Sequence, residues 1–323
     1  MNENIAKLGT AAAPVKPVKY RVPFKRKLAG YAGDWRLYVL LLPAAAYLFV
    51  FNYMPMYGIQ IAFKDFRTGL GIWASPWTGF KHFERFISFP NFGLIVLNTA
   101  RLGLYTLATF PCSVILALLI NELTNLKFKK FVQMITYMPY FLSTVVICSM
   151  ILLFFHHETG FVNRIIELAG GDRVPFITIP EYFSHIYVWS GVWQSVGWGT
   201  IIYLASLSGV SAELVEAARV DGANRIHIIW HINIPSIIPT ITILLILSCG
   251  SVLSADFAKV LLLQNPLNLS RSQIISTYVY EIGLKNSQFS YAAAIGLFNT
   301  VINVAVLLLV NFFAKRVSEI SLW

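Results

Sequence analysis

Long apolar segments alternate with short polar segments along this chain. Six apolar segments are long, and they occupy residues 37–63, 94–120, 132–155, 183–207, 237–263 and 290–314. A helix needs about 20 apolar residues to cross the roughly 30 Å hydrocarbon core of a bilayer, and lipid offers no hydrogen-bond partner to an exposed backbone amide. The pattern therefore predicts an all-α membrane protein with six transmembrane helices, of which the fourth is the least apolar.

The composition agrees with this prediction. The chain is 57% hydrophobic and 12% charged, whereas a soluble domain carries about 25% charged residues. The net charge of +10 comes from Lys and Arg beside apolar segments, which favours a bilayer and excludes nucleic acid as the partner. The first apolar segment is longer than that of a signal peptide, so we expect it to be retained.

The positive charges predict the orientation. Lys and Arg are concentrated in the segments that an N-in, C-in topology places inside: the N-terminal tail, Lys127, Lys129, Lys130, Arg219, Arg225, Lys315 and Arg316. We therefore expect a cytoplasmic basic tail over residues 1–36, a six-helix domain over 37–314 and a cytoplasmic tail over 315–323. Residues 208–236 form a cytoplasmic hairpin in this topology.

The hairpin has helix start and stop signals. Ser211 is placed to cap a first helix that ends at Gly222, where positive φ is allowed. Asn224 is placed to cap a second helix, which Pro235 ends because proline lacks a backbone donor. The sequence predicts two short helices joined at a sharp turn.

The hairpin also carries a spaced motif. Glu216, Ala217, Ala218, Gly222, Ile232 and Pro235 stand in the order Glu-Ala-Ala, three residues, Gly, nine residues, Ile, two residues, Pro. This pattern resembles the cytoplasmic motif of permease subunits in bacterial binding-protein-dependent ABC importers, with Ile234 in place of Leu. The resemblance implies a coupling helix that docks on an ATPase, and it assigns this role to Glu216, Ala217, Ala218, Asp221, Gly222, Ala223, Ile232 and Pro235.

Other segments are similar to the polysaccharide branch of sugar-importer permeases. They are residues 54–58, 62–65, 75–79, 291–296 and 321–323. The resemblance implies the core of a type I importer in the bacterial cytoplasmic membrane. A distinct second permease, two cytoplasmic ATPases and an extracellular solute-binding lipoprotein would be the partners, and an oligosaccharide the substrate. Residues 254–259 depart from the family pattern.

The chain lacks the residues of an enzyme active site. It has no GxxxxGK[ST] phosphate loop, so we expect ATP and Mg²⁺ to be bound by the partner ATPase and this chain to have no cofactor and no catalytic residue. Cys112, Cys148 and Cys249 lie in apolar segments without metal-ligand spacing. His227 and His231 lack the glutamate of HExxH, so no metal site is expected.

Polar and aromatic residues within the spans are candidates for the translocation path. They are Trp193, Gln194, Trp198, Tyr203, Asp256, Asn299 and Asn303. Aromatic rings and amides bind sugars, but a small-residue packing seam explains the fourth span equally well. Asp256 and Lys259 are spaced to pair on one helix face. The aromatic residues of 73–92 fit either an interfacial belt or a docking surface.

Two other classes of function remain as alternatives. An ion-coupled secondary transporter would need buried carboxylates, of which the spans contain almost none. A membrane enzyme would need a nucleophile and base, which we do not find. A non-sugar solute within the same importer class stays open. Trp323, after Lys315 and Arg316, is a candidate for a further ATPase contact.

Overall fold

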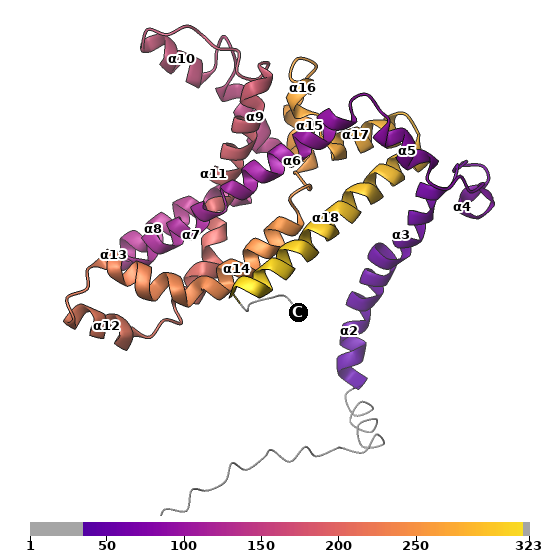
Figure 1. The fold of residues 1–323 in the computed structure, drawn as a ribbon. Coiled ribbons are helices and arrows are strands. Elements are labelled where there is room, and N and C mark those ends of the chain that lie inside the picture. The colour runs from indigo at the N-terminus through magenta and orange to yellow at the C-terminus, as the bar shows by residue number, and fades with distance from the viewer. Residues whose placement is uncertain (1–34, 319–323) are drawn as a thin grey trace, which may run out of the picture. The chain divides into compact units, whose positions relative to one another are not determined.

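The computed structural model describes residues 35–318, and every regular element in them is helical (Figure 1). The basic N-terminal tail up to residue 34 and the C-terminal Trp323 lie outside the described residues. The chain divides into two units at Gly58, and each is described by itself. The all-α prediction is confirmed, since the described residues contain no strand beyond an isolated bridge between Lys64 and Trp77.

The first half of the described chain has these elements: α2 (Trp35–Leu48), η1 (Phe49–Tyr53), α3 (Met54–Met56), η2 (Tyr57–Phe63), α4 (Gly71–Ala74), α5 (Lys81–Ile87), α6 (Phe92–Ala108), α7 (Pro111–Asn121), α8 (Leu126–Tyr137), η3 (Met138–Phe141), α9 (Thr144–Phe154) and α10 (Phe161–Leu168). The second half has α11 (Pro180–Leu207), α12 (Ala212–Val220), α13 (Arg225–Ile228), η4 (Ile229–Asn233), α14 (Ile234–Gly250), α15 (Phe257–Leu263), α16 (Leu269–Ser272), α17 (Ile275–Tyr280), η5 (Glu281–Lys285) and α18 (Phe289–Ser318).

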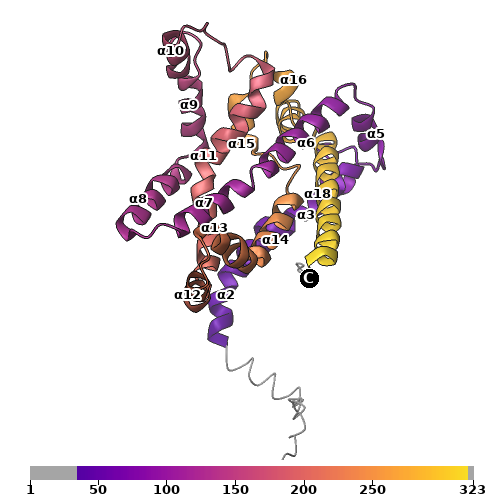
Figure 2. The same cartoon turned by 60° about the vertical axis from the view of Figure 1, so that its left-hand side comes forward.

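Four continuous helical stretches are long and apolar enough to cross a membrane. They are Trp35–Phe63, Phe92–Asn121, Arg225–Gly250 and Phe289–Arg316. Two bent pairs, α8–η3 with α9 and α11 with α12, raise the number to six if each pair is one span. The helices of the second unit pack so that α7 and α8 contact α11, and α14 lies along α18 (Figures 1 and 2).

The third predicted span is not one helix. The chain turns by 97° between η3 and α9. Pro139 lies in η3 and has no amide to continue a helical ladder, while the Ser143 hydroxyl accepts a hydrogen bond from the Val146 amide and so starts α9. A single helix over 132–155 was therefore the wrong prediction, because Pro139 and Ser143 interrupt it.

The fifth predicted span ends early. Its helix stops at Gly250, and α15 begins only at Phe257. Asp256 starts α15 because its carboxylate accepts the Lys259 backbone N–H at 3.2 Å. A single helix over 237–263 was therefore the wrong prediction, since an N-capping acid marks a new helix start.

Three apolar clusters hold the second unit together. The first joins α6, α9, α11 and α15, the second joins α5, α6, α17 and α18, and the third joins α7, α11 and α14. Every cluster includes residues from α6 or from α7, which follows it in the same stretch Phe92–Asn121. This stretch is therefore the common packing partner of the other helices.

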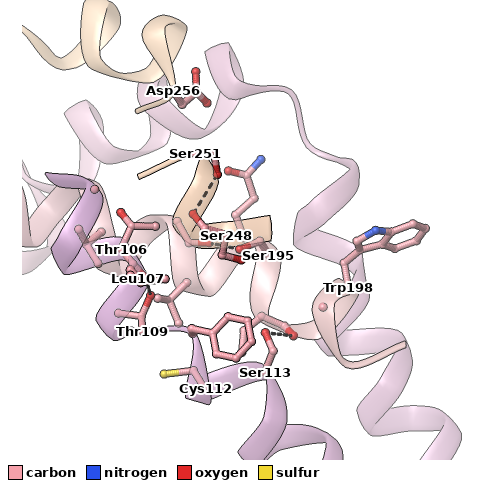
Figure 3. Close-up of a pocket in the computed structure, with 18 of the residues that line it drawn as sticks. Thr106, Leu107, Thr109, Cys112, Ser113, Ser195, Trp198, Ser248, Ser251 and Asp256 are labelled. Carbon is pink, nitrogen blue, oxygen red and sulfur yellow. Dashed lines mark hydrogen bonds between the residues drawn. The ribbon is translucent and has the colours of Figure 1, made fainter. Parts of the chain in front are cut away.

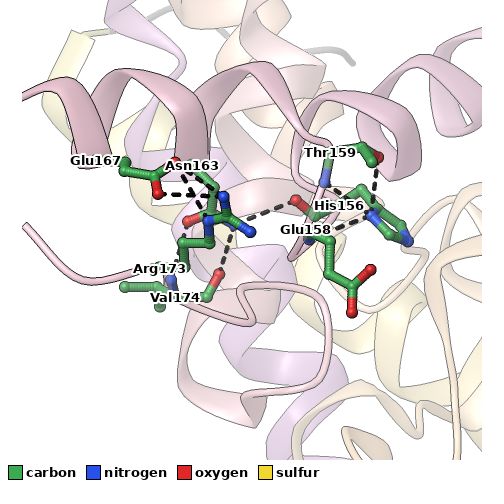
Figure 4. A network of polar contacts seen from close by, with 7 residues as sticks. All are labelled: His156, Glu158, Thr159, Asn163, Glu167, Arg173 and Val174. Atoms are coloured by element: carbon green, nitrogen blue, oxygen red, sulfur yellow. Dashed lines mark hydrogen bonds and ion pairs between the residues drawn. The ribbon is translucent and has the colours of Figure 1, made fainter.

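A polar network fixes the segment around α10 (Figure 4). The Asn163 side-chain amide donates to the carbonyls of His156 and Val174 and accepts the Val174 amide. Arg173 and Glu167 form an ion pair at 2.9 Å. The network closes the loop on both sides of α10 and leaves Leu168 exposed.

Candidate functional site

The turn between α12 and α13 has the geometry of a Schellman motif. Gly222 has φ of +82°. Its amide donates to the Arg219 carbonyl at 3.1 Å, and the Ala223 amide donates to the Ala218 carbonyl at 2.9 Å. These bonds satisfy carbonyls that a helix end otherwise leaves unpaired. The prediction that Gly222 ends the first helix at positive φ is confirmed.

The helix starts differ in part from the prediction. The Asn224 side chain accepts the His227 amide at 2.8 Å, as expected of an N-cap. Ser211 occupies the N-cap position of α12, but its side chain makes no capping bond there. The capping role predicted for Ser211 was wrong. Glu213, in the first turn of α12, still places a negative charge near the positive end of the helix dipole.

Pro235 does not end the second helix, which corrects another prediction. The chain passes from α13 through the π-helical turn η4 directly into α14. The Ile234 amide donates to the Ile229 carbonyl, five residues back. Proline has no backbone N–H to donate, and the π-helical turn directly before it accommodates this missing hydrogen bond. The helix therefore widens locally and continues without a break.

The hairpin of α12 and α13 lies at one end of the helices (Figures 1 and 2), and it exposes large apolar side chains. The exposed fraction is 59% for Leu214, 88% for Val220, 65% for Ile226 and 63% for Trp230. The motif residues lie among them: Glu216, Ala217, Asp221, Gly222 and Pro235 are exposed, and Ala218, Ala223 and Ile232 are half-buried. Such a concentration of exposed apolar area marks an interaction surface.

The base of the hairpin is tied to the end of α7. Asn233 is buried, and its side-chain amide donates to the Glu122 carboxylate at 3.5 Å. Arg219 and Arg225 border the same small polar cavity of about 140 Å³. A displacement of the hairpin would therefore reach α7 directly.

A larger cavity of about 580 Å³ lies between α6, α7, α11 and α14 (Figure 3). In Figure 3 its lining extends from Asp256 at one end to Cys112 and Ser113 at the other. Hydroxyl groups are frequent in the lining, which includes Thr106, Thr109, Ser113, Ser195, Ser248 and Ser251. Apolar walls with several hydroxyls suit a polar solute that carries hydroxyl groups of its own.

Four of the predicted path residues border this cavity: Gln194, Trp198, Tyr203 and Asp256. The Gln194 amide donates to the Leu142 carbonyl at 3.3 Å, which anchors the side chain at the wall. Tyr203 is buried and lies edge-on to Phe110. Trp198 also borders the cavity, but its ring points away from the other labelled residues in Figure 3. The ring stacks on Tyr140, and the two ring centroids are 4.5 Å apart.

The other three lie elsewhere. Trp193 borders a separate apolar cavity between α9 and α11. Asn303 accepts the Leu253 amide at 3.1 Å and donates to the Ser254 hydroxyl at 3.1 Å, across the break between α14 and α15. Asn299 borders a third cavity, next to α17. None of these three is among the residues that line the cavity of Figure 3.

Helix α11 combines the two roles that its sequence left open, a small-residue packing seam and a border of the translocation path. A Cβ on Gly197 would lie 2.0 Å from the Thr136 carbonyl oxygen, so this face packs directly on α8. Ser195, on the opposite side of the helix, lines the cavity. One face is thus the packing seam and the other borders the cavity.

Asp256 and Lys259 do not form the expected ion pair. The two ion pairs within the described residues are Arg67–Asp65 and Arg173–Glu167. The Lys259 ammonium instead donates to the Tyr187 carbonyl at 3.0 Å. The Asp256 carboxylate accepts the backbone amide of Lys259 and does not pair with its ammonium.

Sequence reasoning missed the cavity residues of α6 and α7. Thr106, Thr109 and Ser113 line the cavity. Their spacing of three and four residues places them on one helix face within an otherwise apolar segment, which is a detectable signal.

The rings of His227 and His231 stack, and their centroids are 5.8 Å apart. Within residues 35–318, no cluster of three or more His, Cys, Asp or Glu could hold a metal ion.

Comparison with known proteins places these features in context. Residues 109–319 match the family model described as "Binding-protein-dependent transport system inner membrane component". The chain is 41% identical to the polygalacturonan/rhamnogalacturonan transport system permease protein YteP of Bacillus subtilis (strain 168), over 91% of this chain and 92% of YteP. It is 39% identical to protein LplB of the same organism, over 92% of this chain and 93% of LplB.

Solved structures agree in fold. A bacterial ABC transporter that imports the acidic polysaccharide alginate matches with a TM-score of 0.83 and 37% identity, over 91% of this chain and 99% of the matched chain. The alginate transporter in complex with its alginate pentasaccharide-bound periplasmic protein matches with a TM-score of 0.84 and 36% identity, over 92% and 100%.

Proposed function

Because this chain belongs to the family of binding-protein-dependent transport system inner membrane components, we propose that it is the membrane-spanning permease subunit of an ATP-driven importer of oligosaccharides or polysaccharide fragments. The names of the relatives support this substrate class, since YteP is named for polygalacturonan and rhamnogalacturonan and the matched structure for alginate. The chain is a transport subunit of the inner, cytoplasmic membrane that crosses it several times.

The observation that carries the proposal is the α12–α13 hairpin. The Schellman turn at Gly222 holds two short helices that expose Leu214, Val220 and Ile226. In this proposal the exposed side chains enter a groove on a separate ATPase subunit, which binds ATP and Mg²⁺. Glu216, Ala217, Ala218, Asp221, Ala223, Ile232 and Pro235 set the shape of the inserted surface.

The hairpin would transmit movement through its contact with the end of α7. When ATP closes the ATPase pair, the hairpin moves with it and displaces α7 through Asn233 and Glu122. Because α7 also carries Ser113 into the wall of the 580 Å³ cavity, the cavity opens toward the outside. Hydrolysis then restores the inward state. Gln194, Trp198, Tyr203 and Asp256 would contact the sugar, and Trp193, Asn299 and Asn303 would contribute to the wider path.

The assembly would contain four core chains. We propose a distinct second permease beside this one, two ATPases on the cytoplasmic side and an extracellular solute-binding lipoprotein. The periplasmic protein in the matched alginate complex supports the last of these partners. The 580 Å³ cavity would form one part of the path between the two permeases.

The experiment is to express the tagged chain with its genomic neighbours, purify the complex in mild detergent and weigh it by native mass spectrometry. A mass equal to two permeases and two ATPases is expected, together with ATP-dependent uptake of glycan in proteoliposomes. A chain that purifies alone and imports solute without ATP would contradict the proposal and support a secondary transporter.

A further inference from the structure

The cavity of Figure 3 contains one base in its lining, Lys259, and one acid, Asp256. The Lys259 side chain is 4% exposed. Its ammonium donates to the Tyr187 carbonyl at 3.0 Å and lies 5.1 Å from the centre of the Tyr187 ring. Lys259 is thus a nearly dry cation in the wall of a solute-sized cavity.

No carboxylate of the described residues lies within 4.0 Å of this ammonium, since the ion pairs there involve Asp65 and Glu167. Asp256, three residues before it, accepts the Lys259 backbone amide instead. An ammonium has three donors, and one hydrogen bond to a carbonyl does not replace a counter-ion. A buried charge without a partner is expensive and, within a membrane protein, typically belongs to a functional site.

The Lys259 ammonium lies next to a residue that has no side chain. Gly191 borders the same cavity, and a Cβ at this position would lie 3.4 Å from the Lys259 Nζ. Tyr187, which holds the ammonium, is also part of the lining. The nitrogen therefore lies between two residues that face the cavity.

We propose that Lys259 binds a carboxylate of the transported saccharide, so that the importer takes glycans containing uronic acid residues. This inference rests on the proposed function and adds to it the residue that selects the substrate. A carboxylate would supply the missing counter-ion through a charge-assisted hydrogen bond, which is stronger than a bond between neutral groups. The hydroxyls of Ser195, Ser248 and Ser251 would form hydrogen bonds with the sugar hydroxyls. Asp256 opposes the substrate charge and weakens this contact.

The test compares a trigalacturonate with its methyl ester, in which each carboxylate charge is removed and the sugar hydroxyls are kept. Uptake is measured in proteoliposomes that contain the full complex, with the same binding protein throughout, so that changes between variants report on the permease. Lys259→Met should lower uptake of the acid at subsaturating concentration by about tenfold or more and leave the ester within about twofold. Asp256→Asn should raise the ratio of acid to ester uptake. Lys259→Arg keeps the positive charge and should retain the wild-type ratio of acid to ester uptake.

The exposed Lys285 provides a matched control, because Lys285→Met removes the same charge outside the cavity and should leave both probes unchanged. An equal loss of both probes in Lys259→Met would show that the lysine only fastens α15 to α11, and would overturn the inference. An unchanged ratio in both Lys259→Met and Asp256→Asn would overturn it as well. A wild-type complex that imports a neutral oligosaccharide with ATP but neither of the two probes would overturn the inference alone. A complex without ATP-dependent uptake of any glycan would contradict the proposed function itself.

Discussion

At the scale of single residues, the absence of a side chain sets how closely two helices approach. The α11 backbone at Gly197 touches α8 at Thr136. Gly197→Ala would force a Cβ to within 2.0 Å of a carbonyl oxygen, so the helices must separate at a cost of about 1–3 kcal/mol. We expect a lower melting temperature of the purified complex.

Gly93, in the first turn of α6, is the control for this prediction. A Cβ there would meet no atom within 4 Å, and alanine is the better helix former. Gly93→Ala should leave the melting temperature unchanged or raise it slightly. Equal losses in both variants would contradict the packing argument.

Gly222 acts through its backbone conformation and not through close packing. No atom lies within 4 Å of a Cβ at this position, but φ is +82°, where a β-branched residue is strained by about 1–2 kcal/mol. Gly222→Val should distort the turn, so that the complex hydrolyses ATP with at least several-fold less uptake per ATP.

Asparagine tolerates this conformation better than most residues, so Gly222→Asn should keep most of the coupling. The ratio of solute imported to ATP hydrolysed is the quantity to compare. Normal coupling in Gly222→Val would show that the turn geometry is not needed.

At the scale of elements, the break between α14 and α15 depends on a side chain from another helix. Asn303 of α18 bonds the Leu253 amide and the Ser254 hydroxyl. Asn303→Leu would leave both groups without this partner, at a cost of about 1–3 kcal/mol. We expect faster amide hydrogen exchange over residues 251–256 and a lower melting temperature.

Asn299, one turn earlier on α18, offers the matched comparison. Its buried side-chain oxygen has no hydrogen-bond partner among the described residues, so Asn299→Leu should cost little or be stabilising. If Asn299→Leu destabilises the complex as much as Asn303→Leu does, the Asn303 hydrogen bonds do not stabilise the break between α14 and α15.

The elements were predictable where hydrophobicity alone decides them. The long helices Phe92–Asn121 and Phe289–Arg316 follow from apolar length, and the Gly222 turn follows from local chemistry. The breaks at Ser143 and Asp256 have local signals too, but a window of apolar residues hides them. The cavity was harder to predict, because the hydroxyls that line it come together from α6, α7, α11 and α14 only through tertiary packing.

At the scale of the whole molecule, the orientation in the membrane is a prediction from the positive charges. Single cysteines introduced after replacement of Cys112, Cys148 and Cys249 can test it. Asp172→Cys, in the exposed loop after α10, should react with a membrane-impermeant maleimide in intact cells. Asp221→Cys, at the tip of the hairpin, should react only after the cells are opened. The reverse labelling pattern would show that the topology is inverted.

The exposed hairpin surface also affects the amount of this subunit that accumulates in a cell. A newly inserted copy that has not met an ATPase exposes Leu214, Val220 and Trp230, and quality-control proteases recognise such apolar surface as they do an unfolded chain. We expect surplus copies to be degraded within the time needed to find a partner. The same side chains that drive assembly would then keep permease levels in step with those of the ATPase, without any regulation of its gene.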